Sequence, residues 1–309
     1  MNISATTPFA LLRRRSLLAW SAVLVLLMTG APVSIGESKP ALWKLSDDDS
    51  EIWLFGTVHI LNPDVQWQNR QIRNAFESAD TLITEAPTNE VSPQKMQRLT
   101  MRHGFSKSKR SFLKRLSPEA DANLTQVLAM LGLPEEAVKA SMAQMRPWLA
   151  ATMITVMTIQ VRGADPNAGV DSVLWNQAKA QGKTLAYLET VEDQFNIFAD
   201  LEDAEEMRMF EDTVKQLAEQ PDMLDALVQL WLDAEQDQLA EMMQASMSGM
   251  DSLRDAMLRK RNEDWAEQIK ELMDGSGSYF IAVGAGHLAG SDSVQEILRE
   301  LYDLVAKRQ

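Results

Sequence analysis

Tyr279-Phe-Ile-Ala-Val-Gly-Ala-Gly-His287 is an apolar run that leads directly into a glycine and, three places further on, a histidine. The same arrangement stands near the other end of the chain, in Ile52-Trp-Leu-Phe-Gly-Thr-Val-His59. These two Gly-x-x-His motifs use two of only three histidines among 309 residues. A short apolar run rich in aromatic and β-branched residues indicates a strand. We therefore predict one site that is assembled from both ends of the chain.

The segments around the first motif predict an α/β unit. Leu42–Leu45 and Glu51–Phe55 flank a polar turn and have the pattern of a β-hairpin. Apolar residues at helical spacing predict a helix from about Trp67 to Ser78, and β-branched residues predict a short strand over Thr81–Glu85. Strands that alternate with helices in this way are typical of α/β domains.

The middle of the chain, from about residue 92 to 274, has an overwhelmingly helical pattern. Within it, Leu149–Val161 is apolar on most faces but too short to span a membrane, which predicts a buried helix. One strand is predicted inside this stretch, over Thr184–Leu188.

After the second motif the sequence predicts a helix from about Ser293 and a short closing strand over Tyr302–Ala306. The predicted strands therefore come mainly from the two ends of the chain. We predict an α/β fold in one domain over residues 37–309, with a central mixed sheet built from N- and C-terminal segments and a large helical insertion at about 92–274.

The first 36 residues have the pattern of a secretory signal peptide. Arg13-Arg14-Arg15 precede an apolar stretch at Leu17–Met28, and the small residues Ser34 and Gly36 follow. The pattern predicts cleavage after Gly36 and an exported protein, periplasmic or secreted. An uncleaved N-terminal anchor is the alternative, because residues 17–35 are mostly apolar over a length that could cross a bilayer.

Charge and cysteine content narrow the chemistry. The formal net charge is −14 at pH 7, and such a surface repels phosphate backbones, which argues against nucleic-acid binding. The absence of cysteine excludes disulfides, thiolate nucleophiles and thiolate metal ligands. Any metal must therefore be held by histidine, carboxylate or water.

The two motifs and one carboxylate predict a metal site. Ligands of α/β sheets gather beyond the carboxyl ends of the strands, where His59 and His287 would converge if their strands are neighbours. Glu85 ends another predicted strand and would project into the same region. Two histidines and a carboxylate suit Mn²⁺, Fe²⁺, Co²⁺ or Zn²⁺. Such an ion activates water and polarises a carbonyl, as hydrolysis without a nucleophilic side chain requires.

Three further features have two interpretations each. The sequence around His103 indicates a surface or capping residue at a helix end, with Gly104 at the C′ position. The Met-rich stretch from Met242 to Met257 predicts a helical core or a homodimer seam, with an adaptable peptide groove as the alternative. Arg261 is expected on a helix surface, with a role in holding substrate or stabilising negative charge as the alternative.

Several motifs together resemble the TraB/GumN family, which includes the Tiki proteases. They run along nearly the whole chain from Leu42 to Val305, and they comprise Leu42-Trp-Lys-Leu45, Trp53-Leu-Phe-Gly-Thr-Val-His59, Gly169-Val-Asp171, Tyr187-Leu-Glu-Thr190 with Gln194, Arg261-Asn262-Glu-Asp-Trp265 and Phe280-Ile-Ala-Val-Gly-Ala-Gly-His-Leu-Ala-Gly290. The chain lacks the C-terminal transmembrane span of pheromone-shutdown-type relatives, so the resemblance gives less support to a role in membrane transport.

The resemblance implies an α/β fold related to erythromycin-esterase-like and haem-binding ChaN-like proteins. It also implies that the paired motifs and a glutamate form the metal and catalytic constellation, here His59, Glu85 and His287. Other residues match further motif positions, namely Asp171, Glu189, Arg261 and Asn262. Tiki members act as divalent-metal-dependent proteases.

The sequence therefore predicts an exported, divalent-metal-dependent hydrolase that acts on a peptide or protein. His59, His287 and Glu85 are the predicted metal ligands, and Glu85, Arg261 and Glu189 are the predicted catalytic residues. A non-catalytic protein of the same fold that binds haem or a metal is the alternative.

Overall fold

A six-stranded mixed sheet forms the frame of the molecule in the computed structural model, which describes residues 38–108 and 110–309. The predicted signal peptide, residues 1–36, lies outside the described residues. The strands follow the order β4-β3-β5-β2-β1-β6 across the sheet. They are β1 (Leu42–Ser46), β2 (Ser50–Thr57), β3 (Thr81–Thr84), β4 (Thr184–Tyr187), β5 (Gly277–Gly284) and β6 (Lys307–Arg308).

The four strands β4, β3, β5 and β2 run parallel, whereas β1 pairs antiparallel with β2 and with β6. The structure thus confirms the predicted α/β class, the hairpin and a mixed sheet drawn from both ends of the chain. The C-terminal strand β5 lies between β3 and β2, although β2 and β3 are much closer to each other in sequence.

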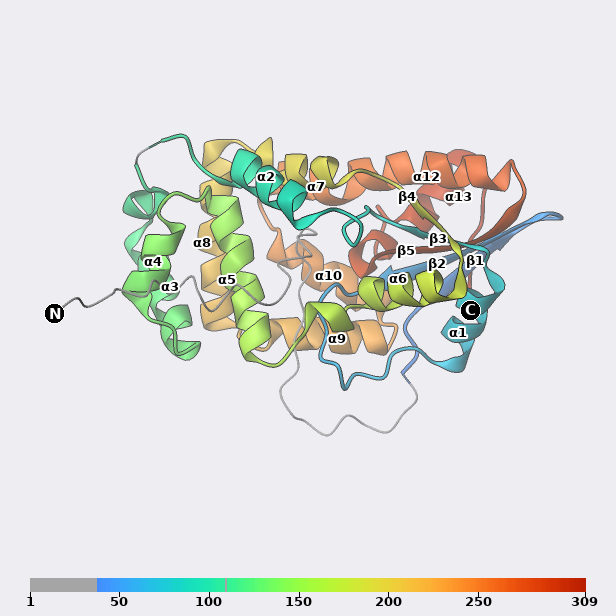
Figure 1. Ribbon diagram of the computed structural model, residues 1–309, viewed down its shortest axis with the longest axis horizontal. Coiled ribbons are helices and arrows are strands. Elements are labelled where there is room, and N and C mark those ends of the chain that lie inside the picture. Colours follow the sequence, from blue (N-terminus) through green and yellow to red (C-terminus); the bar gives the residue numbers. More distant parts are fainter. Residues whose placement is uncertain (1–37, 109) are drawn as a thin grey trace.

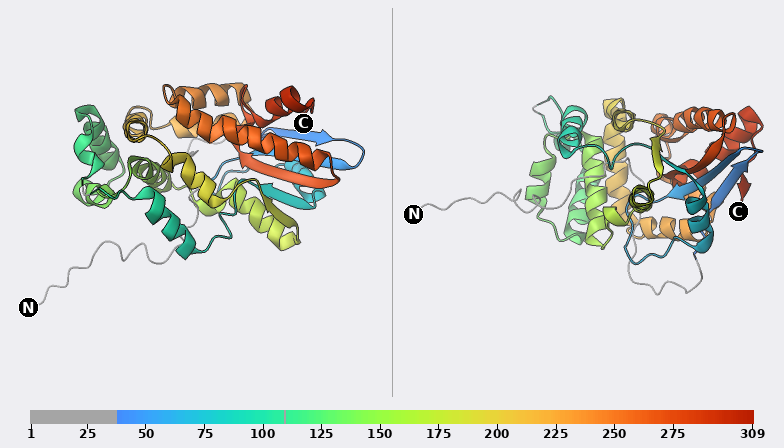
Figure 2. Two further views of the ribbon diagram at one scale, coloured as in Figure 1. Left: turned by 90° about the horizontal axis from the view of Figure 1, so that it is seen from above. Right: turned by 45° about the vertical axis from the view of Figure 1, so that its right-hand side comes forward.

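Both faces of the sheet are covered by hydrophobic cores. Successive side chains of a strand point to opposite faces, so they contribute to the two cores in turn. In β5, Phe280 and Ala282 belong to one hydrophobic core and Ile281 and Val283 to the other. Helices α12 (Lys260–Met273) and α13 (Val294–Tyr302) cover the second core, and helices of the opposite layer cover the first (Figure 2). A strand buried on both faces has the continuous apolar run that made β5 recognisable in the sequence.

The helical insertion extends beyond the carboxyl ends of the parallel strands (Figure 1). In that view α3, α4, α5 and α8 lie at the left and the sheet at the right. The remaining α-helices and short helical turns are α1 (Arg70–Ser78), α2 (Pro93–Gly104), η2 (Phe112–Arg115), α3 (Pro118–Met130), α4 (Glu135–Met142), α5 (Pro147–Val161), η3 (Pro166–Ala168), α6 (Val170–Gln181), α7 (Val191–Ala199), α8 (Asp203–Glu219), α9 (Met223–Leu232), α10 (Gln236–Ser246), α11 (Asp251–Arg254), η4 (Asp255–Arg259) and η5 (Ala285–Leu288).

The apolar stretch 149–161 is part of α5, most of which is buried, as predicted. Its threonines Thr152, Thr155 and Thr158 each donate to the carbonyl four residues earlier, which satisfies their hydroxyl hydrogens inside the core. Within the described residues, every helix is too short or too polar to traverse a bilayer.

Three sequence predictions differ from the structure. The first helix begins at Arg70 instead of Trp67, because the side chain of Asn69 accepts from the backbone N–H of Ile72 and caps it. The closing strand predicted over residues 302–306 is wrong: Tyr302 ends α13, Asp303 turns the chain with a φ of 56°, and the strand follows at Lys307–Arg308. Gly104 is the last residue of α2, and the C-cap is Phe105.

The register of the sheet places the ends of three strands at one edge. Thr57 of β2 pairs with Gly284 of β5, and Thr84 of β3 pairs with Ala282 of the same strand. Because parallel strands end at a common edge, the residues that follow them are brought side by side.

Candidate functional site

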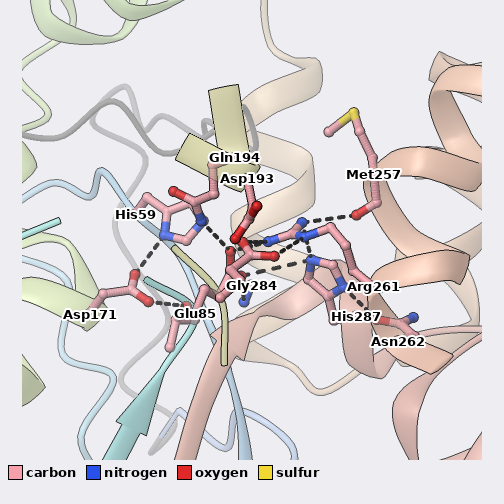
Figure 3. Close-up of polar contacts among 12 residues, drawn as sticks. His59, Glu85, Asp171, Asp193, Gln194, Met257, Arg261, Asn262, Gly284 and His287 are labelled. Atoms are coloured by element: carbon pink, nitrogen blue, oxygen red, sulfur yellow. Dashed lines mark hydrogen bonds and ion pairs between the residues drawn. The ribbon is translucent and has the colours of Figure 1, made fainter. Parts of the chain in front are cut away.

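Four side chains that follow the parallel strands meet beyond the carboxyl edge of the sheet, and Figure 3 labels three of them, His59, Glu85 and His287. His59 follows β2, Glu85 follows β3, Glu189 follows β4, and His287 lies in η5 directly after β5. A Cβ built on Gly284 would lie 3.2 Å from Oε1 of Glu85, 3.5 Å from Nε2 of His59 and 3.6 Å from Cδ2 of His287. The structure therefore brings together all three predicted metal ligands, and only a glycine leaves space between them.

His59 is bonded to a carboxylate from the insertion. Its Nδ1 lies 2.7 Å from Oδ2 of Asp171, and the other carboxylate oxygen accepts from the Thr57 hydroxyl at 2.7 Å. Burial alone would lower the pKa of His59, but the charge of Asp171 and its hydrogen bond outweigh burial and raise the pKa to about 9. His59 is therefore an imidazolium at neutral pH, and its Nε2 faces Gly284.

The start of α6 fixes Asp171 beside His59. The backbone N–H of Val170 donates to the carbonyl of Val58 at 2.9 Å, so the first turn of α6 is docked on the first motif. At Gly169 a Cβ would come within 2.0 Å of the carbonyl oxygen of His59, so only glycine permits this approach.

Glu85 is held by three donors. Its Oε1 accepts from the backbone N–H of Gly284 at 2.7 Å, and its Oε2 accepts from Gln194 Nε2 at 3.1 Å and from Arg261 Nη2 at 2.6 Å. Burial would raise the pKa of Glu85, but the Arg261 charge, together with the His59 imidazolium and the Gly284 N–H, holds it far below its ordinary value. Glu85 is therefore a stable carboxylate and a weak base.

Arg261 occupies the centre of the site, and its side chain is buried, with 9 % of the residue exposed. Nε and Nη2 donate to the two oxygens of Glu189 at 2.9 and 2.6 Å, Nη2 also donates to Glu85, and Nη1 donates to the Met257 carbonyl and to Nε2 of His287, both at 2.9 Å. These bonds use all five N–H groups of the guanidinium. The expectation that Arg261 lies on a helix surface is wrong, because two buried carboxylates neutralise its charge in the interior.

His287 is neutral, in contrast to His59. Since Arg261 donates to Nε2, that nitrogen must accept, and the proton lies on Nδ1, which donates to Oδ1 of Asn262 at 2.5 Å. The orientation of the Asn262 amide is fixed because its Nδ2 donates to the carbonyl of Asp292 at 2.6 Å. Burial and the Arg261 charge lower the pKa of His287 to about 3.

A cleft of about 690 Å³ opens at one side of this site, beside Glu189 and Arg261. Glu189, Arg261 and Trp265 lie in its wall, together with Leu188 and Gln268. Burial raises the pKa of Glu189, although Arg261 opposes this shift. The cleft therefore gives access to the Glu189 side of the guanidinium.

A family model matches residues 41–301, which is most of the chain, and its description is the TraB/PrgY/gumN family. The chain belongs to the TraB/PrgY/gumN family. This confirms the resemblance seen in the sequence motifs. The matched range includes both Gly-x-x-His motifs.

Two relatives in this family are similar over most of their length. The chain is 25 % identical over 247 residues to "Uncharacterized protein YbaP" of Escherichia coli (strain K12), an alignment that covers 80 % of this chain and 87 % of the relative. The YbaP protein of Shigella flexneri gives the same values. No solved structure matches the chain significantly.

The charged residues of this TraB/PrgY/gumN site could be identified from the sequence motifs, but the contacts between them could not. Asp171 and Asn262 matched motif positions without an assigned role, and the structure makes them the partners of the two histidines. The third histidine, His103, lies on α2 beside Phe195 and takes no part in the site. Across residues 38–108 and 110–309, no cluster of three or more His, Asp or Glu side chains is arranged to hold a metal ion.

Proposed function

We propose that this TraB/PrgY/gumN protein is a hydrolase, with a peptide bond as its target, and that its reacting water binds beside Gly284. The observation that carries the proposal is the convergence of Oε1 of Glu85 and Nε2 of His59 on the point where a Cβ of Gly284 would lie. A carboxylate and an imidazolium at this separation can hold one water molecule between an acceptor and a donor.

The two groups have complementary tasks in the proposed reaction. Glu85 is a carboxylate at every pH near neutrality; it accepts a hydrogen bond from the water and takes the proton that the water loses as it attacks the carbonyl. Transfer of this proton to His59, after His59 has protonated the leaving amine, restores both groups. His59, with a pKa of about 9, carries the proton that a leaving amine requires. Asp171 positions His59 and stabilises its charge through the bond to Nδ1.

Two of the three predicted metal ligands, His59 and Glu85, have an atom available to bind a divalent cation. His59 has the arrangement of many metal-bound histidines, with Nδ1 bonded to a carboxylate and Nε2 directed into the site. Glu85 offers Oε1, but Nε2 of His287 already accepts from Arg261. His59 and Glu85 would therefore hold the ion. His59 would bind it through Nε2 only as the neutral imidazole, so the cation would take the place of the Nε2 proton. When bound, the ion supplies a more acidic water and a polarised carbonyl.

The proposed substrate is a peptide or protein, and the proposed compartment is the periplasm or the cell exterior. The compartment rests on the sequence of residues 1–36. The alternative function is non-catalytic binding of haem or a metal. As a haem ligand His287 presents no free Nε2, because that nitrogen is bonded to Arg261.

A peptidase screen supplemented with Mn²⁺ or Co²⁺ tests the proposal, with His59→Ala as the variant. We expect turnover by the wild type and a loss of about 10²–10⁴-fold in kcat/KM for His59→Ala, the range typical of a general acid–base group. His103→Ala is the matched control, because it removes the one histidine outside the site, and it should retain activity.

Elemental analysis of the same three proteins tests the cation separately. We expect metal in the wild type and in His103→Ala, and a loss of metal in His59→Ala. Equal and negligible metal in all three would remove the cation from the proposal, whereas a wild type that cleaves no peptide with either ion would refute the hydrolase itself.

A further inference from the structure

A cavity of about 110 Å³ lies in the helical insertion, among α5, α8, α9, α10, α11 and η4. Its wall contains six methionines. Four come from four different helical segments and two from the turn between α10 and α11: Met209, Met223, Met243, Met257, and Met247 and Met250. Thioether side chains are flexible and polarisable, so a wall built from them adapts to the shape of an apolar guest. Four methionines of the Met-rich stretch are buried in the hydrophobic core, as predicted, and also line this cavity: Met243, Met247, Met250 and Met257.

The hydroxyl groups in this wall are already bonded to their own helices, and Nε2 of Gln216 donates to the carbonyl of Ser246 at 2.9 Å. The hydroxyls of Thr155, Thr213 and Ser246 donate to the carbonyls of Ala151, Met209 and Met243, at 2.8, 2.7 and 2.7 Å. A buried water needs two to four polar partners, and these hydroxyls offer it no free hydrogen. The cavity therefore favours an apolar guest over water.

The cavity shares two wall residues with the site. Met257 lies in the π-helical turn η4, and its carbonyl accepts from Nη1 of Arg261 at 2.9 Å. Met243 packs on the second motif so closely that a Cβ on Gly286 would lie 2.2 Å from its Cε. Single π-helical turns inside helices occur frequently at functional sites. A group bound in the cavity would thus contact the residues that support Arg261 and His287.

We propose that this Met-lined cavity is a binding site for a compact apolar group of about four to six carbons, a branched alkyl or a phenyl group. The size follows from the volume, because a dry apolar cavity of about 150 Å³ in another protein binds benzene. The group can belong to a free hydrophobic molecule or to a side chain of a bound peptide. The proposal does not depend on the proposed hydrolysis.

Full-chain protein labelled with ¹³C at the methionine methyl groups tests the proposal directly. In one arm it is titrated with benzene, and in the other with N-acetyl-leucine amide. We expect saturable shifts of the cavity methyls, while Met101 and Met130, which are 55 % and 50 % exposed, stay unshifted. Saturation by benzene alone identifies a free hydrophobic molecule and saturation by the leucine amide alone identifies a side chain. Saturation by neither overturns the proposal.

Leu227→Phe fills the cavity from a wall residue that is 3 % exposed. We expect it to weaken the benzene shifts at least about tenfold. Leu301→Phe, the same substitution at a residue 63 % exposed, is the control and should leave them unchanged. If Leu227→Phe does not fold, Thr213→Ile narrows the same cavity. Full benzene affinity in a folded cavity-filling variant would contradict the assignment of the shifts to this cavity.

Discussion

His59 and His287 follow neighbouring parallel strands in the same Gly-x-x-His motif, yet their Nδ1 atoms meet different partners. His59 donates to the carboxylate of Asp171, and its pKa is raised to about 9. His287 donates to the amide of Asn262 and accepts from a guanidinium, and its pKa is lowered to about 3. The motif therefore sets where each imidazole lies, and residues from distant helices set its charge.

This difference divides the site into two halves. The reactive half consists of His59, Asp171 and Oε1 of Glu85, and the supporting half consists of Arg261, His287, Asn262 and Glu189. The Nε2 of His59 is directed at Gly284, where Glu85 also presents Oε1. In the other half, every N–H of Arg261 and both nitrogens of His287 are engaged inside the protein. The predicted role of Arg261 as a group that binds substrate or an oxyanion would require it to release one of these partners.

The largest effect should come from Arg261→Met, which removes the cation of the supporting half. Glu85 and Glu189 would then be buried without their shared partner, and breaking a buried ion pair costs about 3–5 kcal/mol. Urea unfolding at neutral pH measures the loss of stability. Arg259→Met is the control: Arg259 is exposed and pairs with Glu263 on its own helix, so we expect a change within about 0.5 kcal/mol. Similar losses in both variants would show that Arg261 does not hold the two carboxylates.

Asp171→Asn should remove the charge that keeps His59 protonated, so that His59 becomes more like the neutral His287. Without the carboxylate, burial dominates, and we expect the pKa of His59 to fall from about 9 by about 1–3 units. An NMR titration of the His59 ring measures this shift. The asparagine side chain keeps one acceptor oxygen for Nδ1 of His59, and its amide N–H can donate to the Thr57 hydroxyl, so the fold should be preserved. An unchanged pKa would refute the role of Asp171.

The same substitution should change how stability depends on pH. The pKa of folded His59 lies above its ordinary value of 6.5, so its contribution is complete below pH 6.5 and is lost as pH rises through about 9. The wild type should therefore lose stability over this window, and Asp171→Asn should lose less. Urea unfolding at several pH values across the window decides between these outcomes.

Asn262→Asp is the reverse experiment on the supporting half. A carboxylate beside Nδ1 should raise the pKa of His287 from about 3 by about one unit. The shift should be smaller than that of His59 in Asp171→Asn, because Arg261 remains bonded to the ring. NMR titration of both histidines in one sample tests this asymmetry, and an equal or larger shift at His287 would contradict it.

Gly284→Ala should have the smallest effect on stability. Its methyl group would lie 3.2 Å from Oε1 of Glu85 and would occupy the proposed water position, so kcat/KM should fall at least about tenfold while the fold is retained. Gly275→Ala is the control, because its Cβ would meet only ordinary contacts at 3.5 and 3.7 Å. Full activity of Gly284→Ala would place the reacting water elsewhere.

The placement of His59, Glu85 and His287 at one edge could be predicted because it follows from local patterns. Each residue ends an apolar run, and parallel strands end together. Their partners could not be found in this way, because Asp171 reaches His59 through the docking of α6 and Arg261 reaches Glu85 through the packing of α12. A helix with an arginine and an asparagine side by side has the pattern of a solvated face, and only the opposing buried carboxylates reveal that this face is internal.

The central position of β5 affects the order in which the strands of the sheet can pair. Strands β2 and β3 are synthesised early, but each pairs with β5, which begins only at Gly277. Until the ribosome has passed that point, both strands have an unpaired edge and the gap between them is open to other partners. The strand that fills the gap also brings Gly284 and His287, so the joining of β2 and β3 into one sheet and the completion of the site are one event.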